Sequence, residues 1–349
     1  MSLPAWMIYG ANGYSGELIA REAKKKGLSP ILAGRREERI RPLAEELGFA
    51  WKAFSLDNMD ALTELKDIDL VLHCAGPFSA TSEPMVSACL KAGAHYLDIT
   101  GEISVFEAVG ARNLEAEGAG VVLCPGVGFD VIPTDCVAAC LKAAMPDASH
   151  LTLGFDSRSQ LSPGTAKTSV EGISQGVKWR RNGTIETARA RFRNIDFGNG
   201  EKEGMMIPWG DVSTAFQSTG IPNIEVYMGI TPAQKKQMAS VGLLRPLLKL
   251  GFVQGYLKRR IERTVKGPAE GELLAYQTSV WGEVRNAAGD HKVARIKTAN
   301  GYLVTRDGAL AITEHLLNGS DAKGAMTPSK LMGAHFVETL PGSSQVVIT

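Results

Sequence analysis

The 349-residue chain lacks several features that would point to particular classes of protein. Its five cysteines (74, 89, 124, 136 and 140) cannot all pair, and Cys136 and Cys140, four residues apart, have no histidine or further cysteine nearby. We therefore expect neither a disulfide framework nor a metal site. The formal net charge is +1, which provides no general attraction for nucleic acid or for an acidic membrane surface. No uninterrupted apolar run approaches the roughly 18 residues of a membrane span.

What is present is an ordinary globular composition. Hydrophobic residues make up 44% of the chain and charged residues 21%, which is enough to bury a sizeable core. The length exceeds what one core usually serves, so two domains are expected. A predicted strand and a glycine-rich loop begin within the first ten residues. A signal peptide would need a charged region and an apolar region there, so we expect none. We therefore expect a cytoplasmic protein.

The pattern of apolar and polar residues changes near residue 148. Residues 1–147 alternate short apolar runs with helical patterns, which predicts an α/β fold with a doubly wound parallel sheet of Rossmann type. Residues 148–304 alternate apolar and polar positions as half-buried antiparallel strands do. This pattern predicts a second α+β domain with a mixed, largely antiparallel sheet. Its expected elements include a helix over 165–179 and a strand over 272–285.

A glycine-rich loop lies between the first predicted strand and the first predicted helix, with the spacing GxxGxxG. Glycines at such a turn permit a close approach of the backbone to a pyrophosphate, which then lies at the helix N-terminus. The position at the start of a βαβ unit makes this signal stronger than the glycines alone. The predicted cofactor residues here are Gly10, Ala11, Asn12, Gly13, Tyr14, Ser15 and Gly16.

The end of the second predicted strand distinguishes between two cofactors. A site selective for NAD carries an acidic residue there for the ribose 2′-hydroxyl, whereas this chain has Gly34, Arg35 and Arg36. Two guanidinium groups would bind the 2′-phosphate of NADP(H) by charge-assisted hydrogen bonds. The small residues Ala75, Gly76 and Pro77, after the fourth strand, would allow close approach of the nicotinamide half.

Titratable residues follow the next two strands and open onto the same edge of the predicted sheet. Tyr96 and Asp98 end the fifth strand, and Asp130 follows the sixth. A hydride transfer is accompanied by a proton transfer, so these three residues are the catalytic candidates. Tyr96 is the first choice of proton donor, as a phenol polarised by Asp98 or Glu102.

Five stretches taken in order resemble the saccharopine dehydrogenase-like family, especially its trans-acting enoyl reductase branch: GANGYSG, LAGRR, HCAGPF, HYLDITGE and PGVGFDVIPTD. The resemblance implies a Rossmann domain, a mixed-sheet second domain and a carboxyl-terminal segment, about 305–349, that packs back on the first domain. It also implies an NADPH-dependent oxidoreductase that reduces an activated C=C or C=N bond of a small or lipid-like substrate. No arginine cluster in the second domain clearly belongs to a pocket for a dicarboxylic amino acid, which disfavours saccharopine as the substrate.

Other interpretations remain open. A non-catalytic NADP-binding sensor or scaffold would keep the same loop. The opening GANGYSGEL also resembles N-acetyl-glutamyl-phosphate reductases, whose semialdehyde dehydrogenase chemistry needs a thiolate just after a Pro-Gly turn, where this chain has Val127. The apolar and basic segment 241–263 suits a weak membrane-surface contact, a wall for an apolar substrate, or a core or interface helix. We expect a small-molecule or acyl-type substrate, a homodimer and no nucleic acid partner.

Overall fold

The computed structural model describes residues 4–58, 60–158, 162–164, 166, 176–236, 251–265 and 267–349. Contacts divide the chain into two compact units, Met1–Ile132 with Tyr302–Gly333 and Pro133–Gly301 with Ala334–Thr349. The boundaries expected from sequence, 147/148 and 304/305, lie near these limits but not at them. Residues 302–333 group with the first unit, whereas residues 334–349 group with the second, where their strand pairs with the second sheet.

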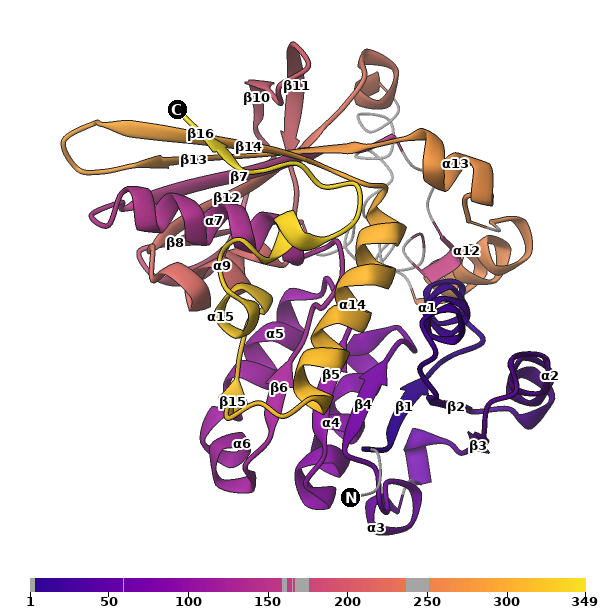
Figure 1. Ribbon diagram of the computed structural model, residues 1–349. Helices are drawn as coiled ribbons and strands as arrows, with labels where there is room; N and C mark the ends of the chain where they lie inside the picture. The colour runs from indigo at the N-terminus through magenta and orange to yellow at the C-terminus, as the bar shows by residue number, and fades with distance from the viewer. Residues whose placement is uncertain are drawn as a thin grey trace. The chain divides into compact units, whose positions relative to one another are not determined.

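The first unit contains a seven-stranded sheet in which every pairing is parallel (Figure 1). The strand order is β15-β6-β5-β4-β1-β2-β3, so the chain runs outward in both directions from β1 and β4. That reversal is the place where Rossmann-type sheets bind dinucleotides, at the carboxyl ends of the strands. The prediction of a doubly wound parallel sheet is confirmed. The strands are β1 Trp6–Tyr9, β2 Ile31–Gly34, β3 Trp51–Ala53, β4 Leu70–His73, β5 His95–Asp98, β6 Val122–Cys124 and β15 Gly324–Ala325.

Helices cover this sheet because its strands are apolar on both faces. Met7, Val71 and Tyr96 point to one face and share a buried cluster with residues of α4, α5 and α6. Helices α1 and α14 are joined by ion pairs of Glu22 with Arg306 (3.4 Å) and of Lys26 with Glu314 (3.7 Å). The helices are α1 Tyr14–Lys25, α2 Glu37–Leu47, η1 Leu56–Asn58, α3 Ala61–Glu64, α4 Phe78–Ala92, α5 Ile103–Gly110, α6 Asn113–Ala119, α14 Gly301–Leu317 and α15 Pro328–Met332.

The second unit is built on a nine-stranded mixed sheet. Its main order is β10-β11-β12-β7-β13-β14-β16, while β8 pairs with β12 and β9. The β7–β12 pair is parallel and the other pairs are antiparallel, as predicted. The strands are β7 His150–Asp156, β8 Val177–Arg181, β9 Thr184–Ala188, β10 Phe192–Asp196, β11 Glu201–Met206, β12 Asn223–Gly229, β13 Thr278–Arg285, β14 His291–Thr298 and β16 Val347–Ile348.

Helix α7 packs on this sheet through a glycine. A β-carbon on Gly282 of β13 would lie 2.7 Å from Val137 and 2.8 Å from Leu141, both on α7. The missing side chain therefore lets the helix lie close to the strand, which explains why α7 belongs to the second unit rather than to the first. The helices here are α7 Ile132–Ala144, α9 Asp211–Thr219, α12 Gly251–Thr264, α13 Glu270–Ala275 and η2 Phe336–Thr339.

Two predicted elements of the second unit differ from the structure. The strand expected over 272–285 is wrong in its first part, because α13 precedes β13. Glu272 accepts a hydrogen bond from the Ala269 N–H (3.3 Å), an interaction that starts a helix. The helix expected over 165–179 falls mostly outside the described residues, and its end, Val177–Trp179, is strand β8.

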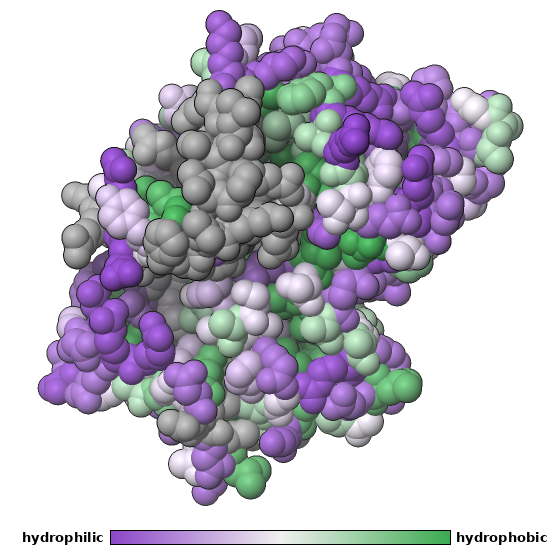
Figure 2. Space-filling view, turned by 180° about the vertical axis from the view of Figure 1, so that it is seen from behind, coloured by the Kyte–Doolittle hydropathy of each residue, from purple (hydrophilic) through white to green (hydrophobic). Residues whose placement is uncertain are grey.

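The apolar and basic segment 241–263 is described only in part. Residues 241–250 lie outside the described residues, and α12 begins at Gly251. On α12 the Tyr256 side chain is 63% exposed. No helix within the described ranges combines the length and apolarity needed to cross a bilayer. On the face shown in Figure 2, hydrophilic residues are interspersed with hydrophobic ones. The weak membrane-surface contact and the homodimer stay predictions.

Candidate dinucleotide and proton-transfer site

The glycine-rich loop lies directly against the loop that follows β4. Gly10 has a φ of +85°, and a β-carbon there would lie 2.7 Å from the backbone N of Ala75. Only glycine accommodates both the backbone angle and this close approach. The Gly10 and Ala11 N–H groups donate to the Ala33 carbonyl oxygen at the end of β2 (2.7 and 3.2 Å). The structure therefore brings together three segments that the sequence proposed separately.

The N-terminus of α1 is shaped to receive an anion. Gly13 is its N-cap, in an extended conformation, and a glycine supplies no side chain to cap the first turn. A β-carbon on Gly16 would collide with the Gly10 carbonyl, so the loop and helix are packed as tightly as the backbone allows. Helix N-termini of this kind favour phosphate groups. The residues present thus fit the pyrophosphate of a dinucleotide.

Two arginines stand where β2 ends. Gly34 lets the Ile40 side chain pack close to the strand end, because a β-carbon would lie 2.8 Å from that side chain and 3.3 Å from Asn12 Oδ1. Arg35 and Arg36 follow it and are exposed. Arg36 Nε is 3.8 Å from Glu38 Oε1, an exposed ion pair that contributes little. Both guanidinium groups are therefore available to a 2′-phosphate.

Glu102 has a role besides the one proposed from sequence. Its Oε1 accepts a hydrogen bond from the Phe78 N–H (2.9 Å), and its Oε2 accepts one from the Ser79 N–H (2.8 Å). These two N–H groups form the start of α4, so Glu102 caps that helix. It also ties the loop after β5 to the loop of Ala75–Pro77. Glu102 therefore ties together two loops at the carboxyl edge of the sheet, and its effect on Tyr96 stays a prediction.

His73, at the end of β4, is a residue that the sequence analysis did not single out. It is fully buried, and its Nε2 lies 3.0 Å from Thr81 Oγ1. The Thr81 hydroxyl in turn donates to the Ala75 carbonyl (2.7 Å). Burial lowers the pKa of His73 to about 3, so the ring is neutral and holds the loop after β4 in place. The sequence feature that could have identified His73 is a histidine at the end of an apolar strand.

Tyr96 and Asp98 form a buried pair. The Tyr96 hydroxyl donates to Asp98 Oδ2 (2.7 Å), while Oδ1 accepts from the N–H groups of Thr100 (2.9 Å) and Gly126 (2.8 Å). Burial raises the pKa of Asp98 to about 6 and that of Tyr96 well above its usual value. Tyr96 is a core residue whose proton points at Asp98. The pair joins the loops that follow β5 and β6.

Asp130 is the remaining catalytic candidate, and its environment is different. It is half-buried, with its carboxylate against Gly101, the residue before Glu102. Burial raises the pKa of Asp130 to about 7. Within the described part of the chain, no residue donates a hydrogen bond to this carboxylate or forms an ion pair with it. A carboxyl group that titrates near neutrality at the carboxyl edge of the sheet is suited to proton transfer.

Helix α14 touches two of these loops through its first turns. The rings of Tyr302 and Tyr14 meet edge to face at 5.0 Å, and Thr305 Oγ1 accepts a hydrogen bond from the Phe129 N–H (3.0 Å). The glycine-rich loop and the loop of Asp130 are thus both anchored to α14. Within the described residues, no group of three His, Cys, Asp or Glu side chains could hold a metal ion.

Comparison with known proteins agrees with this geometry. Residues 6–124 match the saccharopine dehydrogenase NADP binding domain. An Arabidopsis thaliana protein named as a probable mitochondrial saccharopine dehydrogenase-like oxidoreductase is 30% identical over 197 residues, which are 49% of this chain and 43% of the relative. A trans-acting enoyl reductase of Mycobacterium tuberculosis is 33% identical over 138 residues, 37% of this chain and 33% of the relative. The chain thus spans less than half the length of these relatives.

One solved structure shares the fold of both units. Apo saccharopine dehydrogenase (L-Glu forming) of Saccharomyces cerevisiae superposes with a TM-score of 0.68, at 10% identity, over 99% of each chain. At that identity the likeness concerns the fold alone. Residues 6–124 are therefore similar to the saccharopine dehydrogenase NADP binding domain, and the chain as a whole shares its fold with the yeast saccharopine dehydrogenase.

Proposed function

We propose that this protein is an NADPH-dependent reductase that adds hydride and a proton across an activated double bond. The favoured substrate is an enoyl group, C=C, in an apolar acyl-type molecule, ahead of an imine, C=N. The observation that carries the proposal is the carboxyl group of Asp130, half-buried, without a described partner and with a pKa raised to about 7 at the cofactor edge of the sheet.

The cofactor is held by residues already described. The loop of Gly10–Gly16 would receive the pyrophosphate, Arg35 and Arg36 the 2′-phosphate, and Ala75–Pro77 the nicotinamide half. Bound NADPH supplies the hydride. Glu102 and His73 keep the loop of Ala75–Pro77 in place, through the cap of α4 and through Thr81.

Asp130 would supply the proton. With a pKa of about 7, a large fraction of its carboxyl groups carries a proton at neutral pH. The protonated carboxyl can donate to the carbon beside the one that accepts hydride, or to the nitrogen of an imine. General acid catalysis of this kind contributes about 10²–10⁴ in rate. Tyr96 and Asp98 act as positioning residues, because Asp98 accepts hydrogen bonds from the backbone of Thr100, next to the Gly101 that contacts Asp130, and of Gly126 in the loop after β6.

The preference for a C=C bond is supported by the relatives named trans-acting enoyl reductase, which match 37% of this chain. The imine alternative comes from the resemblance to the saccharopine dehydrogenase-like family, whose saccharopine-forming members reduce an imine. An absorbance assay of NADPH oxidation against enoyl thioesters, cyclic imines and aldehydes separates the two. Turnover of imines alone would overturn the enoyl assignment, and NADPH binding without any turnover would favour the sensor or scaffold.

The role of Asp130 is tested with Asp130→Asn, which keeps the shape but removes the titrating proton. We expect a loss of at least 10²-fold in kcat with little change in NADPH affinity. Asp321→Asn, at an exposed position of the same unit, is the matched control and should keep the full rate. An Asp130→Asn enzyme as active as the control would remove Asp130 from the mechanism.

A further inference from the structure

The backbone directly before Asp130 is held by a side chain from a distant part of the chain. The Phe129 N–H donates a hydrogen bond to Thr305 Oγ1 (3.0 Å), and the two residues are 176 positions apart in the sequence. Thr305 lies in the second turn of α14 and is only 9% exposed. Because the bond is partly buried, water competes weakly for it. It ties the loop of Asp130 to α14 within the first unit.

Gly128 makes this contact close. A β-carbon on Gly128 would lie 3.0 Å from both Cγ2 and Oγ1 of Thr305. The methyl group of Thr305 therefore packs on the loop while the hydroxyl binds its backbone. The Gly128 carbonyl accepts a hydrogen bond from the Ile132 N–H (2.9 Å), which begins the turn into α7. Asp130 lies inside this turn, so its backbone is held on both sides.

Helix α14 is itself fixed to α1, the helix of the glycine-rich loop. The Tyr302 ring, one turn before Thr305, meets the Tyr14 ring edge to face at 5.0 Å. Arg306, the next residue after Thr305, forms an ion pair with Glu22 of α1 (3.4 Å). Tyr14 follows the N-cap of α1, where the pyrophosphate would lie. Thr305 thus links the position of Asp130 to the position of that helix terminus.

We propose that Thr305 is a positioning residue for proton transfer, whose hydroxyl keeps the carboxyl group of Asp130 at a fixed place relative to the dinucleotide. Thr305 acts through Asp130, so its role rests on the proposed function of that residue. Within the described residues the Asp130 carboxylate accepts no hydrogen bond, and its place therefore depends on the backbone that carries it. A proton donor must lie within hydrogen-bond distance of its target, and a displacement of about 1 Å can cost about 10²-fold in rate.

Three variants of α14 test the role of the hydroxyl. Thr305→Val keeps the shape but removes the hydrogen bond, and we expect kcat to fall roughly tenfold or more while NADPH affinity changes less than about twofold. Thr305→Ser keeps the hydroxyl and should retain most of the rate. Thr313→Val is the matched control, because the Thr313 hydroxyl is buried without a hydrogen-bond partner in the described part of the chain. NADPH oxidation with the enoyl thioester or imine that is turned over gives kcat, and calorimetry gives affinity.

A double-mutant cycle shows whether Thr305 acts through Asp130. Once Asp130→Asn has removed the titrating proton, Thr305→Val should lower kcat no further. A loss by the same factor in both backgrounds would overturn the positioning role. So would a Thr305→Val enzyme of full rate beside a slow Asp130→Asn enzyme, and in that case the proposed function would survive. An Asp130→Asn enzyme of full rate would overturn the proposed function and the role of Thr305 with it.

The pH dependence of stability provides a readout that needs no substrate. Burial is the cause of the raised pKa of Asp130. Charged groups on the neighbouring segments are engaged elsewhere: Glu102 accepts hydrogen bonds from the start of α4, and Arg306 pairs with Asp307 and Glu22. The pKa of Asp130 therefore reports how far its carboxylate is shielded from water.

Thermal unfolding at pH 8 measures this shielding. Asp130→Asn should raise the unfolding midpoint there, because the amide avoids the cost of a buried negative charge. In the Thr305→Val background the loosened loop lets water reach the carboxylate, so this increase should fall to about half or less. In the Thr313→Val background the increase should be unchanged. An equal increase in all backgrounds would overturn the positioning role, and the same scans show whether each variant folds.

Discussion

The carboxylate of Asp130 packs directly on the backbone of Gly101, so closely that a β-carbon on Gly101 would lie 2.5 Å from Asp130 Oδ2. A side chain at position 101 is therefore excluded by the acid group, and the backbone of the loop after β5 keeps water from part of the carboxylate. This contact accounts for the loss of hydration that raises the pKa of Asp130 to about 7. The raised pKa also makes the stability of the folded protein depend on pH.

Asp130→Asn should stabilise the protein at pH 8 and not at pH 4. A carboxyl group whose pKa is raised from its usual value of 3.8 to about 7 favours folding below pH 4, and this contribution is lost as the pH rises through 7. The amide carries no charge at either pH. We expect a gain over the unmutated chain of roughly 2 kcal/mol at pH 8, measured by thermal unfolding. An equal effect at both pH values would contradict the raised pKa.

Tyr96→Phe should lower stability without abolishing activity. Asp98 Oδ2 would lose its hydrogen bond, which costs about 1–2 kcal/mol, and the pKa of Asp98 would rise further. We expect kcat within a few-fold of the unmutated rate. Tyr227→Phe, which removes a comparable bond to Glu225 in the second unit, is the control for stability. A loss of 10²-fold or more in kcat in Tyr96→Phe alone would restore Tyr96 as the proton donor.

Arg35→Ala should remove most of the preference for NADPH. We expect the unmutated protein to bind NADPH at least tenfold more tightly than NADH, because each charge-assisted bond to the 2′-phosphate contributes about 1.5–3 kcal/mol. NADH affinity should hardly change. Arg39→Ala, at an exposed position in the first turn of α2, is the control. Equal affinities for the two cofactors in the unmutated chain, measured by calorimetry, would refute the assignment.

Gly13→Val should abolish binding of both cofactors while the fold survives. A branched side chain at the N-cap of α1 would fill the path of the pyrophosphate, and its β-carbon would lie 3.3 Å from the Gly10 carbonyl oxygen. Gly118→Val, at a helical glycine whose β-carbon would meet nothing within 4 Å, is the control for folding. If Gly13→Val keeps full NADPH affinity, the dinucleotide lies elsewhere.

The fold of the first unit could be predicted well because the pattern of apolar residues within each segment agrees with the order of strands and helices along the chain. Strands β1 and β4 are short apolar runs that are buried on both faces, and β1 is followed by a turn and the amphipathic helix α1. The carboxyl ends of such strands meet at one edge, so the glycine-rich loop, Ala75–Pro77 and Asp130 could be expected there together. The sequence pattern did not show whether the Tyr96 side chain lies in the core or at the carboxyl edge of the sheet. In the structure Tyr96 belongs to the buried cluster of the first unit.

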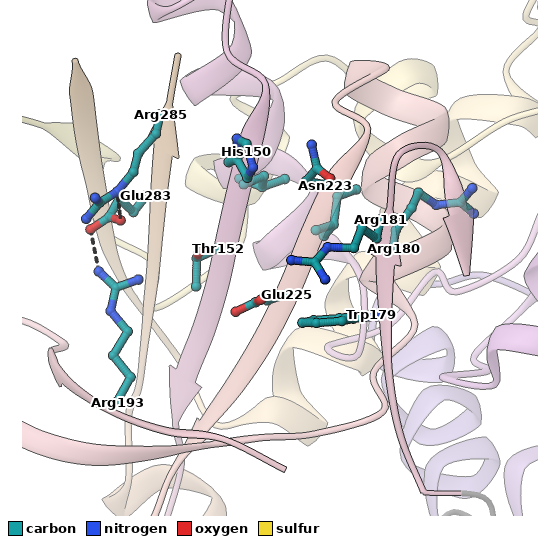
Figure 3. Close-up of a pocket in the computed structure, with 12 residues that line it drawn as sticks. His150, Thr152, Trp179, Arg180, Arg181, Arg193, Asn223, Glu225, Glu283 and Arg285 are labelled. Atoms are coloured by element: carbon teal, nitrogen blue, oxygen red, sulfur yellow. Dashed lines mark hydrogen bonds and ion pairs between the residues drawn. The ribbon is translucent and has the colours of Figure 1, made fainter. Parts of the chain in front are cut away.

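The second unit was less predictable because its arrangement depends on pairing between distant strands. Arg181, Arg193 and Arg285 line one small cavity on the second sheet (Figure 3) although about a hundred residues separate the first from the last. Only the strand register places Arg285 and Asn223 on either side of His150. The sequence alone could not reveal this grouping for that reason. The helix α13 was missed because its capping interaction depends on the backbone geometry at Ala269.

The contact boundaries at residues 132, 301 and 333 mean that neither unit is one continuous piece of chain. During synthesis, β6 leaves the ribosome long before β15, its parallel neighbour at Val122–Gly324 and Leu123–Ala325. The edge of the first sheet at β6 therefore stays open until most of the second unit has been made, and exposed sheet edges invite pairing with other chains. Release of the nascent chain before β15 should thus favour aggregation. The segment that contains β15 is made late, and it covers the open edge of the sheet in the unit that forms first.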